Sequence, residues 1–195
     1  MSFDHFNWIG PIYDRIFGLK QDRSIITLVD ENPHDLILDV GGGTGRAAAL
    51  FDDLGRKVLV IDPAFKMLRV AASKGLKCVN ASSENLPFAE GKVDSLIMVD
   101  ALHHVSDQES SMKELFRLIK ENGKIIIEEP DINHWVVKFI ALAEKLLLMR
   151  SNFLSPEQII SRFEALGDVD PSVHRSKGVA WIIINKNFTQ KDWSD

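Results

Sequence analysis

Four glycines and an aspartate lie together in the stretch LILDVGGGTGR, which runs from Leu36 to Arg46. Glycine in the interior of a helix or strand costs roughly 0.5–1 kcal/mol, so this density of glycines predicts a loop. A glycine loop directly after an apolar strand lets the backbone approach a ligand closely. Dinucleotides, nucleoside phosphates and S-adenosylmethionine all suit such a loop, and the glycines alone do not decide among them.

Two registers of the glycines imply different ligands. Gly43, Gly45 and Ala48 match the pattern G-x-G-x-x-G/A, which indicates a nicotinamide or flavin cofactor. The alternative register begins with Asp39 at the end of the strand and continues with Gly41, Gly43 and Gly45. An acid directly before the glycines suits a ligand that carries an ammonium group and no phosphate.

Two further features would complete such a site. A helix that begins near Thr44 would offer free N–H groups to a carboxylate. Asp62 ends the next apolar run and would accept hydrogen bonds from both ribose hydroxyls of either cofactor. Asp62 also precedes Pro63, and an Asp-Pro pair is an ordinary helix N-cap with proline at the first helical position. We favour ribose binding over this capping role.

Short apolar runs alternate with stretches of helical periodicity from Leu36 onward, which predicts βαβ units and a parallel sheet. The predicted strands are Leu36–Val40, Val58–Ile61, Leu76–Val79, Val93–Val99, Gly123–Glu128 and Val179–Ile184. Ser106 with Glu109 predicts a capping box at the start of one helix, which Asn122-Gly123 would end. Ser155-Pro156 with Gln158 predicts the start of another.

Three stretches, LDVGGGTGRAAALFDDLGRKVLVIDPAFKML, NASSENLPFAEGKVDSLIMVDALHHV and LFRLIKENGKIIIEEP, together resemble the class I S-adenosylmethionine-dependent methyltransferases. Within that class they look like methyltransferase type 11 and the ubiquinone and menaquinone biosynthesis C-methyltransferases. The resemblance runs from Leu38 to about Glu128. It implies an α/β, Rossmann-like fold with a mostly parallel seven-stranded sheet, helices on both faces and an antiparallel C-terminal strand. It also implies S-adenosyl-L-methionine as the cofactor.

The same resemblance assigns cofactor-binding residues. It implies that Asp39, Gly41 and Gly43 surround the methionine moiety and that Asp62 binds the ribose. The other implied residues are Met67, Ser82, Ser83 and Glu84 at the adenine, Asp100, Ala101 and Leu102 on the methyl side, Gly45 and Pro63 within their motifs, and Tyr13 in an N-terminal segment that folds over the cofactor. Similar proteins usually have an acid where Ser82 stands, and a hydroxyl is a weaker acceptor than a carboxylate.

Three residues are candidates for catalysis. His103 and His104 follow a strand end, and histidine titrates near neutrality, so either could act as a general base. The alternative is a framework turn in which one histidine binds backbone groups. Glu128 ends the next strand beside Glu129 and Asp131, where acids could take a proton or simply complement the N-terminus of a following helix, with Asp131 as its N-cap.

We expect one methyltransferase domain over residues 1–195, with an N-terminal helical cap at 1–30 and a helical insertion on the substrate side at 132–166. The segment from Ile132 to Met149 is apolar nearly all round. A helix of this kind must be buried on several sides. It would serve as core, as the face of a homodimer, or as one wall of an apolar substrate pocket.

The composition is 45% hydrophobic and 26% charged, with a formal net charge of -5. Without a basic cluster, the chain is not expected to bind nucleic acid, and no segment approaches the ~20 apolar residues of a membrane span. Cys78 stands in an apolar run as the single cysteine, which predicts a small buried thiol and a reducing, cytoplasmic setting. The N-terminal stretch lacks the cationic region of a secretory signal. We predict no metal site.

The sequence therefore predicts S-adenosylmethionine-dependent methyl transfer to a small-molecule acceptor that is apolar or aromatic. Alignment in a dry pocket would supply most of the catalysis, since well-oriented reactants reach effective molarities of ~10⁵–10⁸ M. One alternative is a nicotinamide-dependent oxidoreductase, which the second glycine register supports. The other is a non-catalytic S-adenosylmethionine-binding protein, which the departure at Ser82 keeps open.

Overall fold

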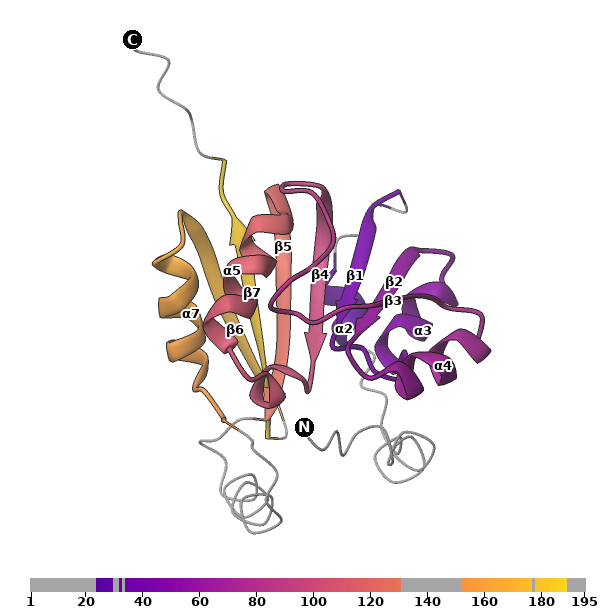
Figure 1. The fold of residues 1–195 in the computed structure, drawn as a ribbon. Coiled ribbons are helices and arrows are strands. Elements are labelled where there is room, and N and C mark those ends of the chain that lie inside the picture. The colour runs from indigo at the N-terminus through magenta and orange to yellow at the C-terminus, as the bar shows by residue number, and fades with distance from the viewer. Residues whose placement is uncertain (1–23, 30–31, 33, 131–151, 177, 189–195) are drawn as a thin grey trace.

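The computed structural model describes residues 24–29, 32, 34–130, 152–176 and 178–188. Seven strands form one sheet in the order β3-β2-β1-β4-β5-β7-β6 (Figure 1). They are β1 (Leu36–Val40), β2 (Lys57–Asp62), β3 (Lys77–Asn80), β4 (Val93–Val99), β5 (Ile119–Pro130), β6 (Val169–Ser176) and β7 (Val179–Lys186). Strands β1 to β5 pair in parallel, whereas β7 is antiparallel to both β5 and β6. The predicted mostly parallel sheet with an antiparallel C-terminal strand is confirmed.

Helices cover both faces of this sheet. They are α2 (Ser24–Leu28), α3 (Arg46–Asp52), α4 (Phe65–Ser73), α5 (Gln108–Leu118) and α7 (Pro156–Glu164), together with a 3₁₀ turn, η1 (Leu102–His104). Helices α3 and α4 pack beside β2 and β3, whereas α5 and α7 pack beside β5, β6 and β7 (Figure 1). The βαβ alternation that the sequence predicts is present from β1 to β3 and again from β4 to β5, whereas the connection from β3 to β4 contains no helix.

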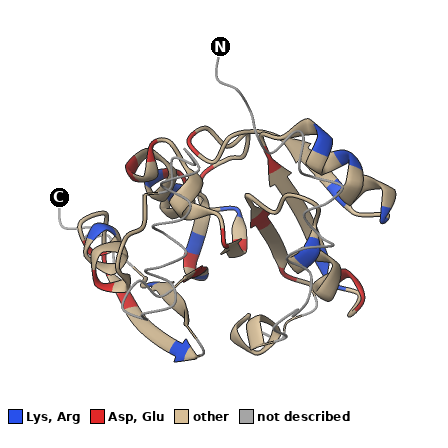
Figure 2. Cartoon of the chain, turned by 90° about the horizontal axis from the view of Figure 1, so that it is seen from below, with Lys and Arg blue, Asp and Glu red and all other residues tan. Residues whose placement is uncertain are grey.

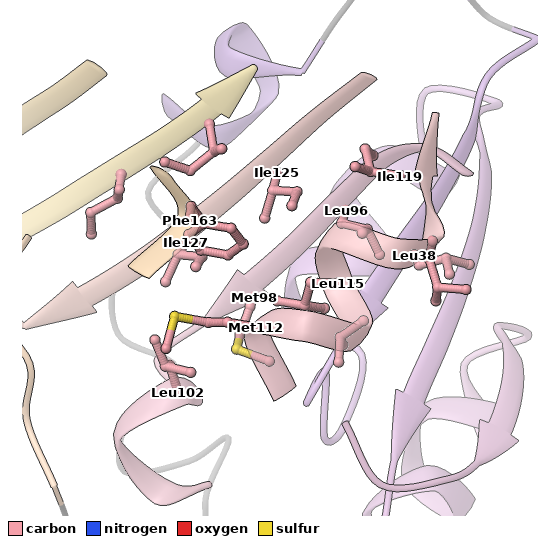
Figure 3. Packing of buried hydrophobic residues seen from close by; sticks show 14 of the residues in the cluster. Leu38, Leu96, Met98, Leu102, Met112, Leu115, Ile119, Ile125, Ile127 and Phe163 are labelled. Carbon is pink, nitrogen blue, oxygen red and sulfur yellow. The ribbon is translucent and has the colours of Figure 1, made fainter. Parts of the chain in front are cut away.

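Successive residues of the central strands enter two separate hydrophobic clusters, because side chains alternate between the faces of a strand. One cluster contains Leu96 and Met98 of β4 with Met112 of α5 and Phe163 of α7 (Figure 3). The other contains Ile97 of the same strand, together with residues of α2, α3 and α4. Because β4 pairs in parallel with β1 and β5, its carboxyl end lies at the same edge of the sheet as theirs, where ligands of such sheets bind.

Three differences from the predicted elements go beyond a shift of a strand end by one or two residues. Helix α5 is capped by Asp107, whose carboxylate accepts from the Ser110 N–H at 3.0 Å, so the capping box predicted at Ser106 is wrong. The helix ends at Leu118, and β5 then runs through Asn122-Gly123, with φ of 60° at Asn122. These two residues therefore lie inside a long strand and do not end the helix.

The third difference is strand β6, which the sequence analysis missed. It is the outer strand of the sheet, and its residues alternate between half-buried and exposed. Its sequence, VDPSVHRS, carries too little apolar patterning to be recognised as a strand.

The capping box predicted at Ser155 and Gln158 is confirmed at the start of α7. Cys78 is half-buried rather than fully buried.

Several predicted features fall partly or wholly outside the described residues. Tyr13, Asp131 and the segment 132–149 are among them, as is all but the end of the predicted cap 1–30, where α2 buries Ile25. In the part of the chain that the structure describes, no helix is long and apolar enough to cross a membrane. The same residues contain no group of three or more potential metal-binding side chains. In the view of Figure 2, basic and acidic residues are interspersed over the described elements.

Candidate active site

The loop after β1 depends on glycine at the point where it meets the turn after β4. Gly41 has φ of 72°, and a Cβ added there would lie 2.7 Å from Cβ of Ala101. The Gly41 N–H donates to the carbonyl of Ile61 at 2.8 Å, which holds the loop against β2. Only a residue without a side chain allows both the left-handed backbone and this close approach. The loop thereby lies between the ends of β2 and β4.

The carboxylate of Asp62, at the end of β2, holds this loop in place by hydrogen bonds. Its Oδ2 accepts from the Gly43 N–H at 2.9 Å, and its Oδ1 accepts from the Ala64 N–H at 2.7 Å. The N-cap of α4 is Ala64, so the alternative that Asp62 is the N-cap is wrong. Asp62 is buried, and each carboxylate oxygen can accept more than one hydrogen bond. Both oxygens can thus also accept from ligand hydroxyls.

A cavity of about 540 Å³ opens at the carboxyl ends of β1, β2 and β4 and beside the loop after β3. Ligands of open α/β sheets bind at this edge. The predicted residues that line it are Gly41, Gly43, Asp62, Pro63, Met67, Ser82, Ser83, Glu84, Asp100, Ala101 and His104. Of the other predicted residues that the structure describes, Asp39, Gly45, Leu102, His103 and Glu128 do not line it.

Asp39 and Gly45, which lie before and at the end of the glycine loop, do not line the cavity. Asp39 is fully buried, and its Oδ2 accepts from the Ala48 N–H at 3.2 Å. Its Oδ1 has no hydrogen-bond partner among the described residues. Burial raises the pKa of this carboxyl to about 7. A side chain at Gly45 would overlap Leu76, so this glycine serves the packing of α3 against its neighbours.

At the other end of the cavity, a buried carboxylate ties the η1 turn to the end of β5. Glu129 Oε2 lies 2.6 Å from His103 Nδ1, and Oε1 accepts from the Leu102 N–H at 2.8 Å. His103 stacks on Phe153 with ring centroids 4.5 Å apart. Both His103 and Glu129 are buried. This pair therefore fixes the turn that carries Ala101 and His104 into the cavity wall.

The three catalytic candidates thus have different surroundings. His104 is the one whose side chain lines the cavity, and burial lowers its pKa to about 3, with a further contribution from the charge of His103. Its imidazole is neutral near pH 7 and is a weak base. Glu128 Oε2 accepts from the indole N–H of Trp181 at 2.9 Å. The structure brings neither His103 nor Glu128 to the cavity surface.

At the β3 end of the cavity, two hydroxyls converge on one carboxylate. Ser82 Oγ and Ser83 Oγ both donate to Oε2 of Glu84, the latter at 3.3 Å. Glu84 Oε1 accepts from the N–H of Asp107 at 3.4 Å. The cavity therefore has a carboxylate at this end although Ser82 occupies the position where similar proteins have an acid.

Several residues of the site could not be predicted from the sequence, or had no role assigned to them. Glu129 was mentioned only as a neighbour of Glu128, and its contact with His103 spans 26 positions, which no local pattern reveals. Arg46 was quoted in the glycine stretch without a role, yet it lines the cavity at the start of α3. Its proximity to the loop was the available signal. The other lining residues without a predicted binding role are Gly42, Ala64, Met98, Val99, Val105 and Ser106, whereas Thr44, which also lines the cavity, lies where the sequence predicts a helix start near the ligand.

The strand order, with the cavity at the carboxyl ends of the parallel strands, is that of the class I, Rossmann-like methyltransferase fold. Residues 38–127 match the family described as methyltransferase domain. A demethylmenaquinone methyltransferase from Thermobifida fusca is 31% identical over 138 residues, which are 64% of this chain and 58% of that protein. A ubiquinone/menaquinone biosynthesis C-methyltransferase from Rubrivivax gelatinosus is 31% identical over 67% of this chain and 56% of its own length. The chain thus spans little more than half the length of these curated relatives.

Solved structures agree on the fold. A methyltransferase from Thermotoga maritima has a TM-score of 0.80 at 20% identity, covering 93% of this chain and 98% of that one. Human N-acetylserotonin methyltransferase in complex with S-adenosylmethionine has a TM-score of 0.76 at 18% identity, over 94% of this chain and 56% of that one. The class I, Rossmann-like methyltransferase fold that the sequence predicts is thus confirmed, and the chain is similar in sequence to quinone C-methyltransferases. The predicted cofactor agrees with this assignment.

Proposed function

We propose that this protein binds S-adenosyl-L-methionine in the cavity and transfers the methyl group to a small acceptor that is apolar or aromatic. The observation that carries the proposal is the Asp62 carboxylate, held at the cavity by the Gly43 and Ala64 N–H groups. The cofactor supplies a methyl group on a sulfonium, whose leaving group is a neutral thioether. The protein then has to bind, orient and exclude water.

The residues of the cavity fit this cofactor. Gly43 has φ of 55°, and a Cβ added there would lie 3.1 Å from Cε of Met67, so the glycine leaves room that a side chain would fill. Asp62 would hold the ribose hydroxyls, and Met67 would pack on the adenine. Arg46 lines the cavity beside this loop, and its positive charge suits the methionine carboxylate.

The acceptor side of the cavity combines apolar residues with the polar side chains of Asp100, His104 and Ser106. The apolar residues are Met98, Val99, Ala101 and Val105, and such side chains favour an apolar acceptor over a charged one. His104 is neutral near pH 7 because burial lowers its pKa to about 3. It would therefore orient an acceptor by hydrogen bonding rather than remove a proton from it. The relatives named for quinone biosynthesis also support an apolar aromatic acceptor.

Calorimetric titration tests the cofactor. We expect S-adenosylmethionine and S-adenosylhomocysteine to bind with one-to-one stoichiometry and nicotinamide cofactors not to bind. Asp62→Ala should weaken both ligands by about 1.5–3 kcal/mol, the range for a hydrogen bond to a charged group. Asp53→Ala, which removes an exposed carboxylate at the end of α3, is the matched control and should leave the affinity unchanged.

The alternatives give different results in the same experiments. Binding of a nicotinamide cofactor alone would overturn the methyltransferase proposal in favour of the oxidoreductase. Tight binding of S-adenosylmethionine without transfer to any member of a panel of quinols, phenols and amines would favour the non-catalytic binding protein. A cytoplasmic location, a homodimer and the absence of nucleic-acid binding stay predictions, and light scattering of the purified protein tests the homodimer.

A further inference from the structure

The order of the strands fixes which end of the cavity is which. Strand β2 lies between β3 and β1, and β4 lies beyond β1. Asp62, at the end of β2, therefore separates the residues after β3 from those after β4. If Asp62 holds the ribose, the base must extend toward one side and the methionine toward the other. The loop after β1, with Gly43 and Arg46, lies on the β4 side, so the base extends toward Ser82, Ser83 and Glu84.

The hydroxyls of Ser82 and Ser83 are donors toward the Glu84 side chain, while the Glu84 backbone N–H donates to Ser82 Oγ at 3.5 Å. Both hydroxyls donate to Oε2 of Glu84, so the serine protons are committed to the carboxylate. Oε1 receives only one long contact, 3.4 Å from the Asp107 N–H, among the hydrogen bonds described for it. A carboxylate oxygen has more than one acceptor position. Glu84 is thus oriented by two hydroxyls and keeps acceptor capacity on a side chain that lines the cavity.

We propose that Glu84, oriented by Ser82 and Ser83, recognises the exocyclic amino group of the adenine. This inference rests on the proposed function and names a residue that determines its specificity. The amino group is a donor, and hydrogen bonds to an ionised acceptor are roughly twice as strong as those between neutral groups. The Ser82 hydroxyl would be the weaker acceptor of the two. Glu84, two positions after Ser82, would thus supply the carboxylate that similar proteins have at position 82.

The test compares two ligands that differ at this amino group. S-adenosylhomocysteine carries it, and S-inosylhomocysteine has a carbonyl oxygen in its place. Wild-type protein should bind the adenine form at least about tenfold more tightly, the effect of one charge-assisted hydrogen bond. Glu84→Ala should weaken the adenine ligand by about tenfold and bring the affinity ratio near one. Glu84→Gln should favour the inosine ligand, because an amide N–H donates to a carbonyl.

Two further variants separate orientation from recognition. Ser82→Ala removes one hydroxyl from Glu84 and should reduce the preference for adenine by a smaller factor, about two- to fivefold. Glu90→Gln changes an exposed acid of the same connection and should leave the ratio as in wild type. Thermal unfolding of each variant without ligand checks that the fold is retained.

The outcomes distinguish this inference from the proposed function. If S-adenosylhomocysteine binds wild-type protein and Glu84→Ala leaves the ratio unchanged, Glu84 does not recognise the base and the inference is wrong. A loss of preference in Ser82→Ala without one in Glu84→Ala would assign recognition to the hydroxyl and would also overturn it. If neither ligand binds wild-type protein, the proposed function falls together with this inference.

Discussion

The cavity has two walls that are built in different ways. The wall after β1 is shaped by backbone groups. Gly41 and Gly43 adopt positive φ, and the Gly43 N–H donates a hydrogen bond to Asp62. The wall after β4 and β5 is held in place by side chains, because the Glu129 carboxylate binds both His103 and the Leu102 N–H. The glycines of the first wall come from one short continuous stretch, which binds Asp62 at the end of the next strand. The second needs residues that are far apart in the sequence.

This difference implies different responses to mutation. A glycine loop tolerates no added side chain, but the conformation it needs is local. A buried pair such as Glu129 and His103 tolerates no loss of either partner, because a polar group left in the interior must do without its hydrogen bond. The glycine wall should therefore control ligand affinity, whereas the Glu129 wall should control the stability of the acceptor side.

The largest effect is expected at Asp39, beneath the glycine wall. Burial raises its pKa from 3.8 to about 7, so the folded protein holds this proton more tightly than the unfolded chain does. The stability contribution is fully present below about pH 4 and is lost as the pH rises to about 7. At 1.36 kcal/mol per pKa unit this amounts to at most about 4 kcal/mol. In Asp39→Asn the unfolding free energy should therefore decrease less between these pH values than it does in wild type.

Chemical denaturation at a series of pH values measures this slope. Relative to wild type, Asp39→Asn should be more stable at pH 8 than at pH 5. Asp94→Asn is a suitable comparison, because the Lys120 contact lowers the pKa of Asp94 despite partial burial. Its variant should leave the slope between pH 5 and pH 8 as in wild type and should differ only below about pH 4, where wild type loses the contribution of the Asp94 carboxylate as the pH falls. Equal slopes for wild type and Asp39→Asn would show that the carboxyl titrates in its ordinary range.

The next largest effect is expected in the second wall. Glu129→Ala leaves the Leu102 N–H and His103 Nδ1 without their partner, and each unsatisfied buried group costs roughly 1–3 kcal/mol, so we expect a loss of about 3 kcal/mol. Glu129→Gln keeps one acceptor and should recover about half of it. Glu128→Gln, which keeps an acceptor for the half-exposed contact with Trp181, is the control. Similar unfolding free energies for the variants at 128 and 129 would refute the special role of Glu129.

A third prediction separates packing from backbone strain in the glycine wall. Gly45 has φ of 75° and Gly91 has φ of 62°. Alanine at either position carries the left-handed strain of roughly 1–2 kcal/mol. At Gly45 the new Cβ also overlaps Leu76, whereas nothing lies within 4 Å of a Cβ at Gly91. Gly45→Ala should therefore lower the unfolding free energy by about 2 kcal/mol more than Gly91→Ala does. Equal losses would mean that Leu76 moves aside freely.

The same two walls explain what the sequence could predict. The parallel strands, the glycine loop and Asp62 were predictable, because each leaves a local signal: an apolar run, a cluster of glycines, an acid at a strand end. The contact between Glu129 and His103 left none, and neither did the two hydroxyls that converge on Glu84. Strand β6 was missed because an outer strand with one half-buried face needs few apolar residues. Pairing across the fold, rather than local propensity, decides these features.

The smallest effect concerns the start of α5, whose first residues lie beside Glu84. Serine and aspartate are both good N-caps, so the sequence SDQES allows helix entry at Ser106 or at Asp107. The structure decides for Asp107, because its side chain accepts from the Ser110 N–H at 3.0 Å and also from the Ser110 hydroxyl at 2.7 Å. Asp107→Ala should lower the unfolding free energy by the usual loss for an N-cap, and Ser106→Ala should leave it nearly unchanged. The pattern should also depend on pH, since the hydrogen bonds from Ser110 lower the pKa of Asp107. A carboxyl with a lowered pKa stabilises the fold above its unfolded pKa, and the contribution is lost as the pH falls through the folded value, so the difference between the two variants should shrink below about pH 4. A larger loss for Ser106→Ala than for Asp107→Ala would place the cap where the sequence pattern first suggested it.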